Sequence, residues 1–252
     1  MRFPHLFEFM DQNWVPSGLR TTLVEMVECC NSPPFQAYYH WVAEETLRAA
    51  CVESFTTIVE LGAGSAPITR VLAIDPRSNA LRLIVCDINP NLRDYEILEE
   101  KYPGKVHGIR TPVNISLPHP WEPRTILVLS ATFHHIPPSE RSKVLLALTN
   151  SAERIMIFEP VRKNLLSVLF VLTSLIPSLL LPLLFFRRPG KLRRLLWCWL
   201  VPIAPFVFWW EGVISSLRQW SDREWRTELE KVLPPERKRT VKSWKVYQMV
   251  AW

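Results

Sequence analysis

The residues best suited to chemistry in this chain stand around one sharp turn, at Glu60, Gly62 and Gly64. Residues 56–59 before the turn are all β-branched, which predicts a buried strand, and apolar residues recur at helical spacing after Pro67. Glycine has no Cβ, so the backbone can turn tightly there and approach a ligand closely. The following helix would point unpaired N–H groups over the turn. The pattern predicts a ligand-binding turn, although a βα turn without a ligand has the same local signature.

The ligand at this turn is better predicted as a cation than as a pyrophosphate. A dinucleotide turn has a third glycine where this chain has Pro67, and that difference disfavours an NAD enzyme. Glu60 ends the strand immediately before the turn. A carboxylate at that point suits a ligand that carries an amino group.

Two further predicted strands end in residues that could bind or react. The second strand, residues 81–87, ends at Asp87, 27 residues after Glu60, and a carboxylate there can accept two ribose hydroxyl protons. The fourth, residues 125–130, runs into His134 and His135. Ligands of open parallel sheets bind beyond the carboxyl ends of the strands. The alternative for Asp87 is a helix cap, and for each histidine a structural hydrogen bond at a helix entry.

The turn at Glu60, Gly62 and Gly64 resembles motif I of the class I S-adenosylmethionine (SAM) methyltransferases, with Ala66 in place of the last glycine. Asp87 is similar to the acid of their second motif. Residues 131–137 resemble the "HHI" loop of quinone-type C-methyltransferases and their small-molecule relatives, O-methyltransferases among them. The resemblance covers residues 35–161 and 211–252. It implies an α/β fold with a doubly wound, seven-stranded Rossmann-like sheet, which a hairpin within residues 239–252 closes.

The resemblance also implies a set of site residues and S-adenosyl-L-methionine as the cofactor. The implied cofactor-binding residues are Glu60, Gly62, Ala63, Gly64, Asp87, Ile88, Asn114 and Ser130. Asn114 stands near the position where related enzymes place an aspartate for the adenine amino group. His134 or His135 is implied as a base or as a group that orients the acceptor, and Glu211 is a further catalytic candidate. The two histidines are adjacent in sequence, which is not a metal-ligand spacing, so we expect no metal.

A long apolar segment interrupts the methyltransferase-like pattern. Residues 165–186 carry no charge, a basic cluster follows (Arg187, Arg188, Lys191, Arg193 and Arg194), and residues 195–210 contain four tryptophans. We therefore expect three parts. Residues 1–161 would form an N-terminal cap and SAM-binding core, residues 162–210 an apolar helical insertion, and residues 211–252 the end of the core.

The insertion has three possible environments. A transmembrane hairpin would place its basic loop on the far side of the bilayer, against the positive-inside bias of short loops. Helices lying on the membrane surface avoid this conflict, because their apolar faces enter the leaflet and the basic turn meets anionic headgroups. A soluble lid over a greasy substrate is the third possibility.

Composition limits the function classes further. Of the 252 residues 48% are hydrophobic and 21% are charged, which predicts a packed core. Five cysteines without C-x-x-C spacing predict reduced thiols and a cytoplasmic protein. The apolar insertion and its basic cluster add the expectation of a peripheral or monotopic association with a membrane surface. We expect a methyltransferase acting on a hydrophobic small molecule or lipid near that surface, with no nucleic-acid partner and with an oligomeric state that the sequence leaves open. The alternative is a non-catalytic membrane-associated module on a methyltransferase fold.

Overall fold

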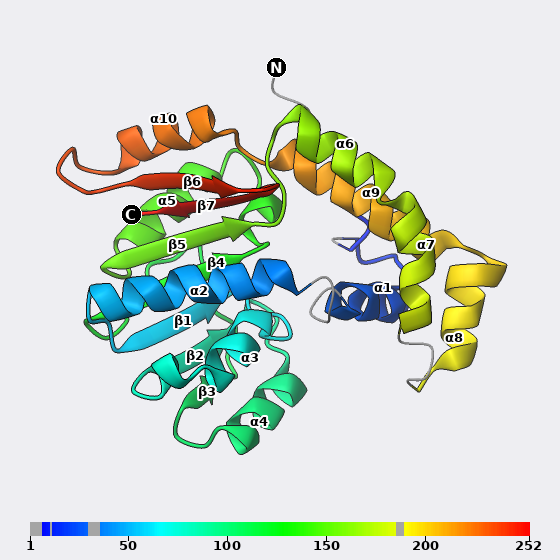
Figure 1. Ribbon diagram of the computed structural model, residues 1–252, viewed down its shortest axis with the longest axis horizontal. Coiled ribbons are helices and arrows are strands. Elements are labelled where there is room, and N and C mark those ends of the chain that lie inside the picture. Colours follow the sequence, from blue (N-terminus) through cyan, green and yellow to red (C-terminus); the bar gives the residue numbers. More distant parts are fainter. Residues whose placement is uncertain (1–6, 11, 30–35, 185–188) are drawn as a thin grey trace. The chain divides into compact units, whose positions relative to one another are not determined.

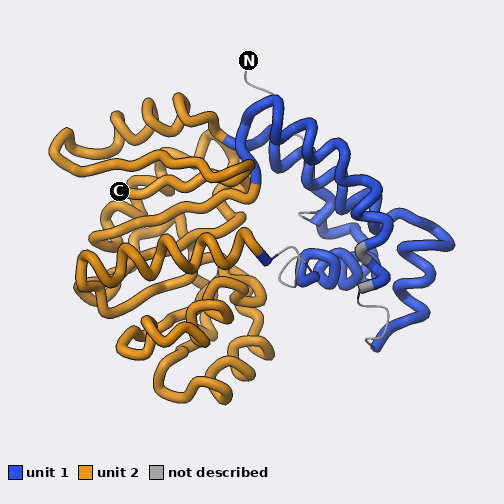
Figure 2. The backbone as a smooth tube through the Cα atoms, in the orientation of Figure 1, with its two compact units in different colours: residues 1–36, 161–219 blue, residues 37–160, 220–252 orange. Residues whose placement is uncertain are grey.

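The computed structural model describes residues 7–10, 12–29, 36–184 and 189–252. The chain divides into two compact units (Figure 2). The sheet unit comprises residues 37–160 and 220–252, and the helical unit comprises residues 1–36 and 161–219.

The sheet unit is built on one mixed sheet, which within the described residues has seven strands in the order β3-β2-β1-β4-β5-β7-β6 (Figure 1). Strands β1 to β5 pair in parallel, whereas β7 is antiparallel to both β5 and β6. The strands are β1 (Thr57–Leu61), β2 (Arg82–Cys86), β3 (Val106–Gly108), β4 (Thr125–Ser130), β5 (Arg154–Glu159), β6 (Thr240–Trp244) and β7 (Tyr247–Ala251). This architecture confirms the predicted doubly wound sheet and its closing hairpin.

Helices cover both faces of the sheet, and each face has its own apolar core. One core packs side chains of α2 (Ala37–Val52), α3 (Pro67–Ile74) and α4 (Leu92–Lys101) on alternate strand residues such as Ile58 and Val128. The other packs α5 (Arg141–Thr149) and α10 (Asp222–Val232) on the intervening residues, such as Val59 and Leu127. Two 3-10 helices, η1 (Pro76–Ser78) and η2 (Phe133–His135), lie in the connections. Burial on both faces accounts for the nearly continuous apolar runs of the central strands.

The register of the parallel strands brings the predicted functional residues to one edge. Leu61, the last residue of β1, pairs with Cys86 of β2 and with Leu129 of β4. The next residues along these strands are Gly62, Asp87 and Ser130. They therefore emerge at the same carboxyl edge of the sheet, where α/β proteins bind ligands.

The helical unit consists of α1 (Ser17–Cys29), α6 (Leu165–Thr173), α7 (Leu175–Leu184), α8 (Lys191–Leu195), the π-helix η3 (Leu196–Leu200) and α9 (Ile203–Arg218). Its small core joins Leu23 and Met26 of α1 with Cys198 of η3 and Val207 of α9. Buried ion pairs supplement this core. Arg194 contacts Glu25 at 3.1 Å, and Arg218 contacts Glu8 at 3.1 Å.

The unit boundaries differ from those predicted from sequence. Residues before 37 group with the helical unit, and α9 runs without a break through the predicted boundary at residue 210. The described part of the uncharged run 165–186 forms two helices, because α6 ends at Thr173 and α7 begins at Leu175. Pro177 explains this break, since its ring would clash with the carbonyl of Thr173, four residues earlier.

Parts of the sequence predictions fall on undescribed positions. Phe186, Arg187 and Arg188 lie outside the described residues, as does Phe35 at the start of the methyltransferase-like region 35–161. Across the described ranges, no single helix has both the length and the hydropathy needed to cross a bilayer. The bent pair Lys191–Leu200 and Ile203–Arg218, which meet at 70°, satisfies that test of length and composition only when taken together.

Candidate active site

A cavity of about 350 Å³ opens beyond the carboxyl ends of β1, β2 and β4, entirely within the sheet unit. It is large enough to hold a substantial part of a small ligand. Its lining residues are Gly62, Asp87, Ile88, Val113, Asn114, Ile115, Ala131, Thr132 and His135. Four of the predicted cofactor-binding residues and one predicted catalytic residue therefore lie around one space.

The glycine turn forms one wall of this cavity, and its geometry requires glycine. Gly62 has a φ of +66°, and a Cβ there would lie 2.7 Å from Cγ2 of Thr132. Gly64 has a φ of +51°, and a Cβ there would meet no atom within 4 Å. Ala66, where motif I has its last glycine, also has a left-handed backbone, with φ 56° and ψ 52°. A non-glycine residue in that conformation costs about 1–2 kcal/mol.

Asp87 connects the turns that follow β1 and β2. Its Oδ2 accepts a hydrogen bond from the backbone N–H of Gly64 at 2.9 Å, and its Oδ1 accepts one from Asn89 at 2.8 Å. A carboxylate offers about four acceptor positions. The half-buried Asp87 therefore keeps acceptor capacity on the side of the cavity, where a vicinal diol could donate to it.

Glu60 occupies a different environment from the one its motif position suggests. Its carboxylate is 2% exposed and accepts hydrogen bonds from the backbone N–H groups of Thr69 at 2.8 Å and Ile68 at 3.2 Å. It thus holds the first turn of α3 against the end of β1. Burial raises the pKa of Glu60 from 4.5 to about 7, although these hydrogen bonds favour the charged form. A direct contact between Glu60 and a ligand amino group stays a prediction.

The remaining predicted cofactor residues lie close to the turn. Ala63 is buried, and its N–H donates to the carbonyl of Cys86 at 3.1 Å. The hydroxyl of Ser130 is 3.0 Å from the hydroxyl of Tyr38 on α2. Asn114 lines the cavity while its Oδ1 accepts a hydrogen bond from the N–H of Ser116 at 2.9 Å. Ala63 and Ser130 do not line the cavity, and the cofactor-binding roles of all three residues stay predictions.

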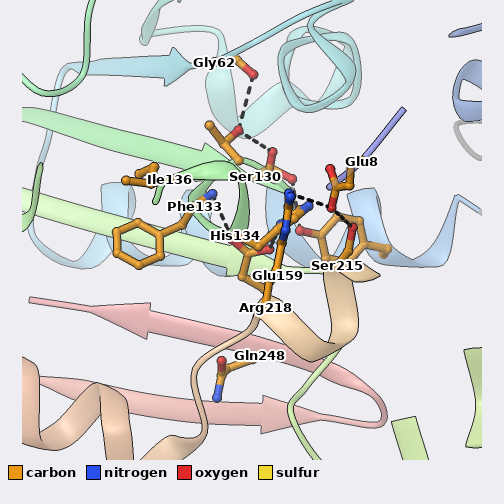
Figure 3. Close-up of polar contacts among 12 residues, drawn as sticks. Glu8, Gly62, Ser130, Phe133, His134, Ile136, Glu159, Ser215, Arg218 and Gln248 are labelled. Carbon is orange, nitrogen blue, oxygen red and sulfur yellow. Dashed lines mark hydrogen bonds and ion pairs between the residues drawn. The ribbon is translucent and has the colours of Figure 1, made fainter. Parts of the chain in front are cut away.

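The two histidines of η2 have different surroundings, and Figure 3 shows His134 beside Glu159. His134 is buried, and its Nδ1 lies 2.7 Å from Oε2 of Glu159, the last residue of β5. The other oxygen of Glu159 accepts a hydrogen bond from the N–H of Phe133 at 3.0 Å. His135 is exposed and lines the cavity. Glu159 therefore fixes the orientation of His134, whereas His135 lies at the cavity, with its ring centroid 4.2 Å from that of His134.

Glu211, the third catalytic candidate, belongs to α9 in the helical unit. Its Oε1 accepts a hydrogen bond from the backbone N–H of Met10 at 2.7 Å. This bond fastens the N-terminal segment to α9. The predicted catalytic role of Glu211 remains a prediction.

Four lining residues were not predicted from sequence: Val113, Ile115, Ala131 and Thr132. Ala131 and Thr132 lie in the stretch after β4 that the sequence places beyond the strand ends, although neither was named as a site residue. Val113 and Ile115 flank Asn114 in a connection without regular structure. Only the backbone path brings them to the cavity, since the N–H of Val113 donates to the carbonyl of Asp87 at 2.9 Å.

Comparison with known proteins reveals similarity of structure rather than of sequence. No sequence profile of a known family matches the chain, and no curated protein matches it. The plantazolicin methyltransferase BpumL in complex with SAH has a TM-score of 0.59 at 10% identity, over 96% of this chain and 92% of BpumL. An O-methyltransferase family 2 protein from Planctomyces limnophilus, in complex with apigenin, has a TM-score of 0.53 at 12% identity, over 95% and 62%.

A third similar structure, LepI in complex with SAM, has a TM-score of 0.50 at 15% identity. The match covers 83% of this chain but only 46% of the LepI chain. At these identities the comparisons show the fold alone. The chain therefore has the Rossmann-like α/β fold of class I SAM-dependent methyltransferases.

Proposed function

We propose that this protein is a SAM-dependent methyltransferase that transfers a methyl group to a hydrophobic small molecule or lipid at or near a membrane surface. The observation that carries the proposal is the cavity at the carboxyl edge of the sheet. It joins the glycine turn at Gly62 with the carboxylate of Asp87 on adjacent strands. This combination suits a nucleoside with a cationic amino acid end. Structures with the same fold contain SAM or SAH, which agrees with this choice of cofactor.

The residues present fit SAM. The turn at Gly62 and Gly64 lets the backbone approach the ligand, and Asp87 would accept hydrogen bonds from the ribose hydroxyls. Ile88, 51% exposed at the cavity, would cover an apolar face of the base, and Asn114 offers a polar contact to its edge. When bound, SAM supplies a methyl group on a sulfonium sulfur, which a nucleophile displaces in line.

His135 is the residue that we assign to the acceptor side. Transfer requires the acceptor atom to lie about 3 Å from the donor carbon, and holding this geometry can supply much of the acceleration. A base is needed only when the acceptor has a proton to lose, and histidine suits a phenol or an activated carbon acid. The buried pair of His134 and Glu159 supports the loop that carries His135.

The hydrophobic acceptor is proposed from the helical unit and from one similar structure. Helices α6 and α7 leave many leucine side chains exposed, so the protein has a surface suited to greasy molecules. The similar protein from Planctomyces limnophilus was solved with apigenin, a small molecule, which supports an acceptor of modest size. The acceptor atom, carbon or oxygen, follows from identifying the product.

The direct test incubates the purified full-length protein with methyl-labelled SAM and a lipid extract, followed by mass spectrometry of the products. We expect one hydrophobic species to gain the label. Ile88→Asp should reduce labelling about tenfold or more, because it places a second carboxylate beside Asp87 in the cavity. Ile97→Asp is the matched control, since Ile97 is 44% exposed on α4 and outside the cavity. Equal loss in both variants would contradict the assignment of the cavity.

A non-catalytic membrane module on the same fold is the second candidate function. The exposed apolar surface of the helical unit favours it, as does Asn114 in the place of an adenine-binding aspartate. This candidate predicts that cells with Asp87→Ala keep normal function while cells with a charged α6–α7 surface lose it. The opposite pattern supports the enzyme.

A further inference from the structure

Helices α6 and α7 expose their apolar residues and bury their serines. The exposed residues, here called the apolar face, are Leu165, Leu166, Leu169, Phe170, Leu172, Ile176, Leu179, Leu180 and Leu183, which are between 42% and 74% exposed. By contrast, Ser167 is 0% exposed and Ser178 is 3% exposed. This is the reverse of the pattern of a helix whose outer side contacts water.

Of the two buried serines, Ser178 is satisfied within its helix, whereas the hydroxyl of Ser167 has no hydrogen-bond partner among the described residues. The hydroxyl of Ser178 donates to the carbonyl of Ser174 at 2.8 Å, and that of Ser174 donates to the carbonyl of Val171 at 2.6 Å. Intrahelical bonds of this kind hide a hydroxyl from an apolar solvent as well as from a core. The outer side therefore offers hydrocarbon and very little hydrogen-bonding capacity.

The inner side of these helices is covered by α9. The indole N–H of Trp209 donates to the carbonyl of Leu172 at 3.2 Å, and a Cβ on Gly212 would lie 3.2 Å from Val171. The glycine thus permits close helix packing. One side of α6 packs on α9, and the other side is exposed. This arrangement suits a helix that lies in the plane of a membrane–water interface.

Charge complementarity identifies the occupant of the apolar face. Arg162 and Lys163 precede α6, and the exposed Lys191 follows α7, whereas residues 165–186 contain no charge. A partner protein would be expected to meet a rim of polar groups and several hydrogen bonds, which this face does not provide. Cations at both ends of a hydrocarbon surface match the anionic headgroups and acyl chains of a lipid leaflet.

We propose that α6 and α7 lie in the plane of an anionic leaflet, with the apolar face in the acyl region and the flanking cations at the headgroups. This inference rests on the membrane part of the proposed function and adds the surface, its orientation and the lipid charge. The α6–α7 surface would hold the protein where a hydrophobic acceptor is dissolved.

The test is co-sedimentation of the full-length protein with vesicles of phosphatidylcholine alone or mixed with phosphatidylglycerol. The wild type should bind the mixed vesicles and should bind less as salt increases. The double variant Leu169→Glu, Leu180→Glu should lower the partition coefficient about tenfold or more, because it puts charges into the acyl region. Both leucines are exposed, at 50% and 56%, so the fold should tolerate the change.

Leu146→Glu on α5 is the matched control, since Leu146 is also 50% exposed but lies in the sheet unit. It should bind vesicles as the wild type does. SAH binding by calorimetry should be unchanged in every variant, which separates failure of this inference from failure of the proposed function. Wild type that does not bind vesicles, or a double variant that binds normally, would overturn the inference. If the wild type forms a concentration-dependent dimer and does not bind vesicles, and only the double variant loses the dimer, the apolar face would be assigned to a second copy of this chain instead.

Discussion

At the scale of single residues, Glu60 combines burial with a pKa near neutrality. The folded protein holds a proton on this carboxyl up to about pH 7, whereas the unfolded chain releases it near 4.5. Between these values the folded state binds more protons, so the contribution of Glu60 to stability falls as pH rises through this window. The contribution is complete only below about pH 4.5.

Replacing Glu60 with glutamine should therefore flatten the pH dependence of the free energy of unfolding between about pH 5 and 8. The slope is the quantity to compare, because glutamine offers one acceptor oxygen for the two N–H donors of Ile68 and Thr69 and so lowers the stability at every pH. Denaturant melts at several pH values measure this. An unchanged slope would show that the hydrogen bonds from Ile68 and Thr69 already offset the burial.

Gly62 and Gly64 form a matched pair for testing the turn. Gly62→Ala should destabilise the protein by about 2–3 kcal/mol and abolish SAH binding, because its Cβ would meet Thr132 at 2.7 Å in addition to the positive φ. Gly64→Ala carries only the strain of its positive φ, so about 1–2 kcal/mol is expected. Thermal melts with and without SAH compare the two variants. Equal destabilisation would mean that the contact with Thr132 is unimportant.

At the scale of elements, α10 begins with a capping box. Ser221 accepts a hydrogen bond from the N–H of Glu224, whose carboxylate accepts one from the N–H of Ser221. Ser221→Ala should cost about 1 kcal/mol of stability. Glu224→Gln should cost less, since glutamine preserves the reciprocal bond. Denaturation midpoints that rank the two variants in the reverse order would contradict this account of the helix start.

Strands could be predicted where a short run of neighbouring residues carries the signal, whereas contacts between residues far apart in the sequence could not. Residues 81–87 and 125–130 were predicted as strands and contain β2 and β4, because each is a short apolar run buried in the sheet. The cap by Glu60 was missed, since its partners Ile68 and Thr69 stand eight and nine residues away on α3. The helix start after Pro67 was the available signal, because an acid suits unpaired N–H groups.

At the scale of the whole molecule, the division into units could not be read from the sequence. The helical unit consists of two chain segments, residues 1–36 and 161–219. Ion pairs such as Glu8 with Arg218 and Glu25 with Arg194 join the first segment to the second. Charged residues so far apart give no periodic signal. The cavity residues were easier to predict, because the parallel register brings Gly62 and Asp87 to one edge whatever their separation.

Each unit should respond to its own ligand. Hydrogen–deuterium exchange should show that SAH protects amides near residues 60–64, 87–89 and 131–135, which surround the cavity. Anionic bicelles should instead protect peptides from α6 and α7. Protection of α6 and α7 by SAH with none around the cavity would contradict the placement of the cofactor.

The central claim, that the glycine turn and Asp87 grip a sulfonium nucleoside, is tested most directly by calorimetric titration of the purified protein with SAH. The wild type should bind with saturable heat. Asp87→Asn should bind about tenfold or more weakly, because it loses charge-assisted hydrogen bonds to the ribose, while Ile97→Asp binds as the wild type does. Wild-type protein that gives no binding heat, or Asp87→Asn protein that is folded and binds as tightly as the wild type, would contradict the account.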